Sequence, residues 1–187
     1  MKDTISQIFT DAASLKSKIA TDDRFIDSVA TAASILKEAT NTGGVIYACG
    51  NGGSACDAMH LTEELVARFK RERLGIKAMH FIDGSTISCW GNDYSYEGVF
   101  KRYAETFCSP RDVLVVISTS GNSKNLILAA QAAKDRGTKV IGLLGKGGGS
   151  LLSLCDAAIV VPSESTERIQ EIHISVIHTF CEILEGG

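Results

Sequence analysis

Two side chains that can handle protons follow a glycine-rich turn near residue 50. The stretch VIYACGNGGSACDAMHLTEEL (residues 45–65) reads as a buried strand, a turn through residues 50–54, and a helix that carries His60 and Glu64. Their i, i+4 spacing places the imidazole and the carboxylate on one face of that helix. Such a pair can be a metal site, an acid–base pair or a surface ion pair, and spacing alone favours the ion pair. The preceding turn favours chemistry, because a helix N-terminus attracts anions.

A second polar turn resembles the first. ISTSGNS (residues 117–123) follows another apolar run and, like ACGNGGS (residues 48–54), combines glycine, asparagine and serine before a helix. Glycine lets a ligand approach the backbone closely, and the free N–H groups of the helix start bind anions. The hydroxyl groups that can add donors are those of Ser54, Ser118, Thr119, Ser120 and Ser123. Neither turn contains the lysine of a nucleotide-binding P-loop, so the pair suits a sugar phosphate better than a nucleoside triphosphate.

Two other interpretations of these turns stay open. Ser54 or Ser123 can simply cap the helix that follows it, because serine is a favoured N-cap residue. The pattern Gly50-x-Gly52-x-x-Ala55, with Asp83 at the end of the second strand, also fits a dinucleotide-binding motif. The duplicated hydroxyl-rich turn favours a phosphate group over a dinucleotide.

The C-terminal segment TERIQEIHISVIHTFCEILE (residues 166–185) predicts a long helix that is apolar on most sides and therefore buried. His178 lies in an apolar context that is typical of a core histidine. His173 is expected to be a second core histidine, with an exposed position as the alternative. Gln170 and His178 are eight residues apart, about 12 Å along a helix axis. Both can line one cavity, but joint contact with one ion would require Gln170 to lie near a frayed helix start.

Periodicity along the chain predicts an α/β fold. Helical stripes are expected over residues 3–20, 23–40, 54–70, 95–107 and 123–136, with a short helix at 149–154. Apolar runs predict strands ending at Cys49, Ile82, Ser118, Gly145 and near Pro162. Near-continuous apolar strands that alternate with helices indicate a three-layer α/β/α domain, whose five-stranded parallel sheet has the flavodoxin-like order 2-1-3-4-5. Ligands bind beyond the carboxyl ends of such strands, which selects the turns at 50–54, 118–123 and 145–150.

Composition narrows the classes of partner. The 187 residues carry a net charge of -3, so nucleic acid is not an expected partner. The one basic run, RFKRER (residues 68–73), is predicted to be a solvated helix end. No apolar run approaches the roughly 20 residues that span a bilayer, so no membrane partner is expected. The six cysteines lack CxxC spacing and are predicted to be reduced and buried in a cytoplasmic protein.

Four motifs together resemble one family. YACGNGGSACDAMHLTEEL, ISCWGNDYSYEGVFKRY, VISTSGNSKN and RIQEIHISVIH are similar to the phosphoheptose isomerases of the sugar isomerase (SIS) fold, over nearly the whole chain. The resemblance implies an aldose–ketose isomerase that converts D-sedoheptulose 7-phosphate to D-glycero-D-manno-heptose 7-phosphate, feeding ADP-heptose and lipopolysaccharide core synthesis. It also implies one zinc ion per subunit and a homotetramer with sites at subunit interfaces. We therefore expect a single SIS domain over residues 1–187, with residues 1–40 used in assembly and 41–187 forming the α/β core and C-terminal helix.

The resemblance also implies roles for particular residues. Glu64 would be the base that moves a proton between C1 and C2, and His178 the partner acid or base. The implied zinc ligands are His60, Glu64, Gln170 and His178. The implied substrate contacts are Asn51, Gly52, Gly53, Ser54, Glu64, Arg68, Asn92, Asp93, Ser118, Thr119, Ser120, Ser123 and Gln170. The chain departs from the family at Glu167, where many members have aspartate, and at Ala55, where some have a larger polar residue.

Two alternatives belong to other functional classes. Some SIS proteins similar to this family bind the bacterial replication initiator and catalyse no known sugar chemistry. Others sense sugar phosphates or isomerise a different phosphosugar. The complete set of Glu64, Gln170 and His178 favours an enzyme, and turnover across a panel of phosphosugars separates the three possibilities.

Overall fold

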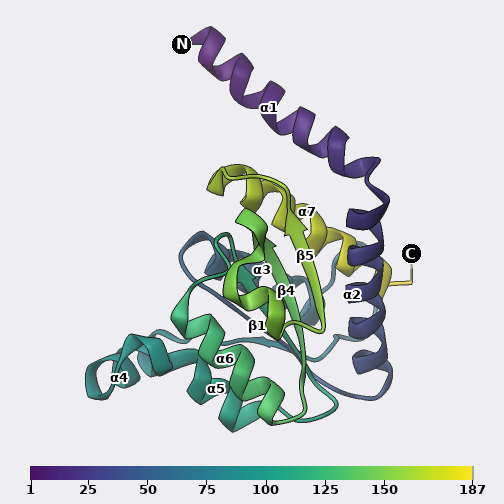
Figure 1. Cartoon of the computed structure of the whole chain (residues 1–187). Coiled ribbons are helices and arrows are strands. Elements are labelled where there is room, and N and C mark those ends of the chain that lie inside the picture. Colours follow the sequence, from purple (N-terminus) through teal and green to yellow (C-terminus); the bar gives the residue numbers. More distant parts are fainter. Residues whose placement is uncertain (187) are drawn as a thin grey trace.

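The computed structural model describes residues 1–186, which are built around a five-stranded parallel sheet (Figure 1). The strands are β1 (Ile46–Gly50), β2 (Ala78–His80), β3 (Val113–Ser118), β4 (Lys139–Gly145) and β5 (Ala157–Val161). Their order is β2-β1-β3-β4-β5, as predicted, and all neighbouring pairs are parallel. All residues of β1 and β3 are buried, which explains their unbroken apolar sequences.

Helices cover both faces of the sheet. The α-helices are α1 (Lys2–Ala20), α2 (Asp23–Asn41), α3 (Gly53–Val66), α4 (Gly84–Asp93), α5 (Val99–Phe107), α6 (Lys124–Asp135) and α7 (Thr166–Leu184), with 3₁₀ segments η1 (Tyr96–Gly98) and η2 (Lys146–Leu154). Successive strand residues point to opposite faces. Ile46 and Ala48 therefore pack with α2, α3 and α7, whereas Tyr47 and Cys49 pack with α5 and α6. The two clusters are the cores of a three-layer α/β/α fold.

One helix prediction was wrong at its end, and one helix was not predicted. α3 ends at Val66, not at residue 70, so the basic run at 68–73 lies in the loop before β2 and is not a helix end. α4 was not predicted, because its residues are exposed or half-buried and present no clear apolar stripe. Asp83 begins α4 as its N-cap, where the carboxylate accepts a hydrogen bond from the backbone N–H of Thr86 at 2.8 Å.

All six cysteines are free. Cys49, Cys108 and Cys181 are buried and Cys155 is half-buried. The prediction of burial was wrong for Cys56 and Cys89, which are exposed on α3 and α4. Within residues 1–186, no helix is long and apolar enough to cross a bilayer.

Candidate active site

Two histidines and one glutamate meet between α3 and α7. The Nε2 atom of His60 lies 3.3 Å from Oε1 of Glu64 and 3.2 Å from Nε2 of His178. One side-chain atom from each of the three residues lies within 4.8 Å of the other two. The Glu64 side chain is 18% exposed and that of His60 is 40% exposed, so water and small molecules can reach the cluster from one side. The arrangement can hold a metal ion or transfer protons.

The packing of α7 beside α3 produces this meeting. A Cβ atom added to Gly53 would lie 2.5 Å from Nε2 of Gln170, so only glycine allows α7 to approach the start of α3 this closely. His60 is seven residues after Gly53 and His178 is eight residues after Gln170, and these two histidines also meet. The two helices therefore run side by side in the same direction. The structure joins three of the four predicted metal ligands in one cluster and places Gln170 beside Gly53.

His173 has a different environment from His178, although both belong to α7. It is fully buried, and its Nε2 atom lies 3.1 Å from the backbone oxygen of Leu144 in β4. Burial lowers the pKa of His173 to about 4, although the hydrogen bond to Leu144 acts in the opposite direction. His173 is therefore a neutral core residue at physiological pH, whereas the half-buried His178 faces His60.

The turn after β1 does not use its serine as a helix cap. Gly52 is the N-cap of α3 and adopts a φ of 57°, which favours glycine. Ser54 is buried within the first turn of the helix. The interpretation of Ser54 as an N-cap was therefore wrong. At the start of α3, the N–H groups of Ser54 and Ala55 donate to the backbone oxygens of Asn51 and Gly52 at 3.1 and 3.0 Å, which leaves the N–H groups of Gly52 and Gly53 for a ligand.

The turn after β3 presents hydroxyl groups that are free to donate. Ser118 accepts a hydrogen bond from the Gly121 N–H at 3.0 Å, and Ser120 accepts one from the Asn122 N–H at 3.2 Å. Both hydroxyl protons then remain available, because a hydroxyl donates as well as accepts. Ser123 is the N-cap of α6, but its side chain makes no capping hydrogen bond. The hydroxyl groups of this turn can therefore donate to an anion.

The turn at residues 145–150 packs against the turn at residues 118–123. A Cβ atom added to Gly121, whose φ is 65°, would lie 1.9 Å from the backbone oxygen of Gly148. The Oδ1 atom of Asn122 accepts hydrogen bonds from the Ser150 N–H at 2.9 Å and from its hydroxyl at 3.0 Å. Residues 145–150 thus fix the shape of the turn at 118–123.

Sequence reasoning missed two residues that join the first turn to α6 and η1. Asn51 and Asn125 exchange amide hydrogen bonds of 3.0 and 2.8 Å, and the Tyr96 hydroxyl donates to Oδ1 of Asn51 at 2.8 Å. Each amide nitrogen uses one of its two hydrogens in this exchange, so the pair still offers donors to an anion. Asn125 follows the second turn as the last residue of SGNSKN, which was a usable signal, whereas no local pattern pointed to Tyr96.

Four further candidates lie on the surface. Arg68 is exposed in the loop after α3, and Glu167 is exposed in the first turn of α7. Asn92 and Asp93 are exposed at the end of α4, where the Asn92 amide donates to Asp93 at 2.9 Å. Within residues 1–186, no hydrogen bond or ion pair joins any of these four to the cluster of His60, Glu64 and His178.

The dinucleotide interpretation depended on Asp83. That carboxylate accepts hydrogen bonds from the hydroxyl groups of Ser85 and Thr86 and from the Thr86 N–H. The Ser85 hydroxyl, with those Thr86 donors, lowers the pKa of Asp83 to about 2. Asp83 is therefore engaged in capping α4, and nothing in its surroundings supports a dinucleotide site.

Comparisons with known proteins show the family of this chain. A SIS domain model matches residues 9–145. A phosphoheptose isomerase from Proteus mirabilis is 46% identical over 98% of this chain and 96% of its own. The chain belongs to the phosphoheptose isomerase family of SIS proteins. A relative from Cytophaga hutchinsonii with the same name is 43% identical over 99% of this chain and 97% of its own.

Solved structures of this family have the same fold. A phosphoheptose isomerase from Neisseria gonorrhoeae superposes with a TM-score of 0.93 at 33% identity, covering 100% of this chain and 99% of the other. One from Francisella tularensis gives 0.94 at 32% identity, covering 99% and 98%. The predicted α/β fold and family are therefore confirmed.

Proposed function

We propose that this isomerase converts D-sedoheptulose 7-phosphate to D-glycero-D-manno-heptose 7-phosphate. The observation that carries the proposal is the meeting of Glu64 and His178 beside His60, in a chain whose relatives are named phosphoheptose isomerases. A carboxylate and an imidazole within reach of one substrate suit the transfer of a proton between neighbouring carbons. The alternative of a pure binding protein gives this pair no role.

In the proposed reaction, Glu64 removes a proton from C1 of the open-chain ketose and returns it to C2 through an enediol. His178 moves the oxygen-bound proton from O1 to O2, so the number of protons on the substrate is unchanged. Oε1 of Glu64 faces His60, which leaves Oε2 for the carbon-bound proton. Glu64 belongs to α3, and His178 packs against the same helix through His60. The two groups are therefore held in fixed positions, and this orientation supplies part of the rate enhancement.

The cluster also fits a zinc ion. The Nε2 atom of His60 lies 3.2 Å from Nε2 of His178 and 3.3 Å from Oε1 of Glu64. Two ligand atoms of one zinc ion are separated by about the same distance when their bonds to the metal are about 2.0–2.1 Å. His60, Glu64 and His178 would hold such an ion, with Gln170 as the further ligand that the family resemblance implies. When bound, a zinc ion would stabilise negative charge that develops on the two substrate oxygens.

The phosphate group is proposed to bind at the turns after β1 and β3. Backbone N–H groups at the starts of α3 and α6, together with the hydroxyl groups of the turn at 118–123, form a set of donors. The hydrogen bonds between Asn51 and Asn125 join the two turns. Binding of the phosphate group at a distance from the reacting carbons supplies binding energy that orients those carbons.

We propose a homotetramer in which residues 1–40 assemble the subunits. α1 extends away from the sheet (Figure 1) and buries only Ile19, while Phe9 is 71% exposed. An apolar groove of about 350 Å³ lies between α1, α2 and α7. Apolar surfaces of this kind are typical of contacts between copies. Light scattering at micromolar concentration is expected to give a tetramer, which Ile26→Asp in the groove dissociates. A monomeric wild-type protein would contradict the assembly.

The cellular setting follows from the proposed chemistry. Its product would supply ADP-heptose and lipopolysaccharide core synthesis. The six free cysteines support a cytoplasmic location, because free thiols persist in reducing compartments.

Turnover across a panel of phosphosugars in deuterated water tests the proposed function. NMR should detect heptose 7-phosphate formed from sedoheptulose 7-phosphate, with deuterium at C2 in the molecules for which the Glu64 carboxyl group exchanged its proton with solvent before returning it. Turnover of a different phosphosugar alone would change the substrate. Binding without turnover of any member would favour the binding protein.

A further inference from the structure

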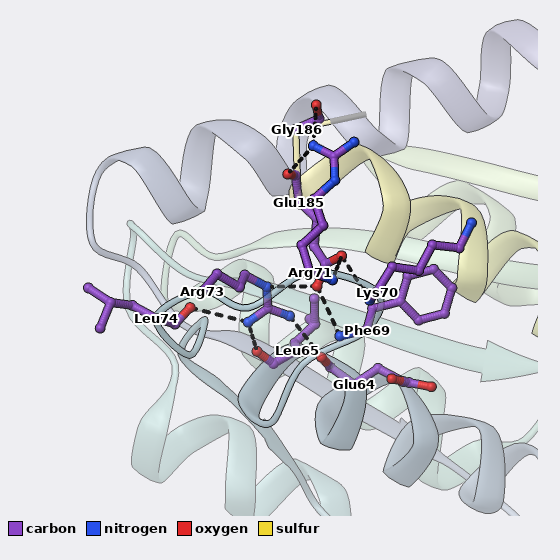
Figure 2. A network of polar contacts seen from close by, with 9 residues as sticks. All are labelled: Glu64, Leu65, Phe69, Lys70, Arg71, Arg73, Leu74, Glu185 and Gly186. Atoms are coloured by element: carbon purple, nitrogen blue, oxygen red, sulfur yellow. Dashed lines mark hydrogen bonds and ion pairs between the residues drawn. The ribbon is translucent and has the colours of Figure 1, made fainter.

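The loop at residues 67–75, between α3 and β2, is fixed by a carboxylate from the other end of the chain. Figure 2 shows Glu185, directly after α7, reaching into this loop. Its Oε1 atom accepts from the Phe69 N–H at 2.9 Å, and its Oε2 atom accepts from the N–H groups of Lys70 and Arg71 at 2.9 and 3.0 Å. The Nε atom of Arg73 donates to Oε1 at 3.1 Å. Four donors thus satisfy one carboxylate.

Such a carboxylate is not an ordinary surface charge. The Glu185 side chain is only 3% exposed, and burying an ionised group is costly unless donors replace its water. Burial acts to raise the pKa of Glu185, but the N–H groups of Lys70, Phe69 and Arg71 and the Arg73 guanidinium outweigh it and lower the pKa to about 2. Glu185 is therefore ionised at neutral pH.

The first connection runs from Glu185 through Arg73 to Glu64. The guanidinium of Arg73 donates to the backbone oxygens of Leu65 and Glu64 at 2.8 Å each, as Figure 2 shows. These carbonyl groups belong to the last turn of α3, where no later turn of the helix supplies N–H groups to bind them. Arg73 also places positive charge at the helix C-terminus, where the dipole favours it. The backbone of Glu64 is thereby fixed by a group that Glu185 orients.

The second connection runs from Glu185 through Phe69 to His178. The Phe69 ring stacks on the His178 imidazole, with ring centroids 5.6 Å apart and planes at 26°. The backbone N–H of Phe69 is one of the groups that Glu185 binds. The same carboxylate therefore holds the ring that packs against the second chemical group.

We infer that Glu185 is a positioning residue that sets the proposed base Glu64 and the proposed acid–base group His178 relative to each other. The inference rests on the proposed function for the roles of those two side chains. Glu185 touches neither the substrate nor the reacting atoms. It acts by fixing one loop whose Arg73 and Phe69 contact the backbone of Glu64 and the ring of His178.

Glu185→Gln tests this inference with Glu182→Gln as a matched control. The Glu185→Gln substitution replaces an accepting oxygen with an amide N–H group, at a site that four donors line. Glu182 lies in the last turn of α7, just before Glu185, and also contacts the loop, but only through the exposed ammonium of Lys70. We expect kcat of Glu185→Gln to fall about tenfold or more, because small displacements of reacting groups are costly. KM should change much less, since the phosphate turns lie elsewhere, and Glu182→Gln should change neither.

NMR of the histidine Cε1–H groups gives a readout that does not depend on activity. The chain has four histidines, and His178→Gln identifies the signal of His178. Phe69→Leu gives the position of that signal without a stacked ring. In Glu185→Gln the His178 signal should move toward the Phe69→Leu position. Glu182→Gln removes a charge one turn from His178 but leaves the Phe69 N–H bound to Glu185, so its signal should not move toward that position.

Each connection also has its own variant, which keeps the inference testable if Glu185→Gln does not fold. Arg73→Lys keeps the charge but cannot reach both helix carbonyls, so kcat should fall while the His178 signal stays in place. Phe69→Leu should lower kcat while the position of Glu64 stays unchanged. A folded Glu185→Gln protein with wild-type kcat and His178 signal would overturn the inference, as would wild-type kcat in both Arg73→Lys and Phe69→Leu. Absence of turnover in the wild-type protein would refute the proposed function alone, because the His178 signal still tests Glu185.

Discussion

The Nε2 atom of His178 lies 3.2 Å from Nε2 of His60, although 118 residues separate them in the chain. Two imidazole nitrogens at this distance are joined either by one N–H···N hydrogen bond or by a shared cation, because two lone pairs repel. Glu64 lies 3.3 Å from His60, so its carboxylate can balance the charge of a shared cation. Substitutions in this cluster and in the turns next to it should therefore have separable effects.

Glu64→Gln should abolish isomerisation while the protein stays folded. The amide has almost the shape of the carboxylate but cannot accept a proton from carbon. Turnover of sedoheptulose 7-phosphate measured beside circular dichroism checks this, and His178→Gln should lose roughly 100-fold or more. Activity close to wild type in a folded Glu64→Gln variant would rule out the assigned base.

His60→Ala should lower the zinc content of the purified protein. The variant removes one nitrogen ligand, while Glu64 and His178 keep their positions on α3 and α7. Metal analysis by mass spectrometry is the measurement, with His80→Ala as the control, because His80 belongs to β2 and lies outside the cluster. Equal zinc in His60→Ala and wild type would show that the ligand set is wrong.

Thr119→Val should weaken binding of the phosphosugar about tenfold or less. The substitution keeps the shape and removes one hydroxyl, and a hydrogen bond of this kind contributes roughly 0.5–1.5 kcal/mol, more when its partner is charged. Adding Ser120→Ala should increase the loss. Calorimetry with the unphosphorylated heptulose is the control, and equal losses for both sugars would place the phosphate elsewhere.

Tyr96→Phe should also weaken phosphosugar binding, through Asn51. Loss of the hydroxyl leaves Oδ1 of Asn51 with one donor in place of two, so its amide is held less firmly. Tyr94→Phe is the matched control, because Tyr94 is exposed and stacks on Trp90. If the two variants bind the phosphosugar equally well, Tyr96 does not position the first turn.

His173 should make the protein less stable in mild acid. The unfolded chain binds a proton on this histidine below about pH 6.5, whereas the folded protein binds it only near pH 4. The unfolded state therefore holds more protons in that window, and stability falls as the pH drops from about 6.5 to about 4. Burial raises the pKa of Asp57 to about 6, which acts in the opposite direction.

The comparison of His173→Gln with wild type isolates the histidine from such other groups. Glutamine can still donate to the backbone oxygen of Leu144 but does not titrate. Urea midpoints at pH 7.5, 5.5 and 4.5 should fall less steeply with acid in the variant. Parallel curves for the two proteins would show that His173 is not the cause.

The sheet and the face shared by His60 and Glu64 were both predictable from local sequence. Unbroken, short and β-branched-rich apolar runs such as residues 113–118 favour buried strands, and their alternation with helices leaves few topologies. The i, i+4 pair needs nothing beyond regular helix geometry, so it was predictable without knowledge of any neighbour.

Contacts between distant segments were not predictable in the same way. Asn51 and Asn125 are 74 residues apart, and Glu185 binds a loop more than 110 residues earlier. Local sequence predicts a helix end for the basic run in that loop, because only the folded chain supplies the buried carboxylate that Arg73 meets. The exposed helix α4 was missed because it buries no residue and carries little periodic signal.

The two histidines of α7 show where local information ends. Both lie in the apolar sequence EIHISVIHTF, and five residues separate them, which is about 140° around a helix. One side therefore faces β4, where His173 meets Leu144, and the other faces α3, where His178 meets His60. Their spacing in the sequence sets the angle between the two side chains, but only the packing of α7 between the sheet and α3 determines which histidine is buried and which faces the site.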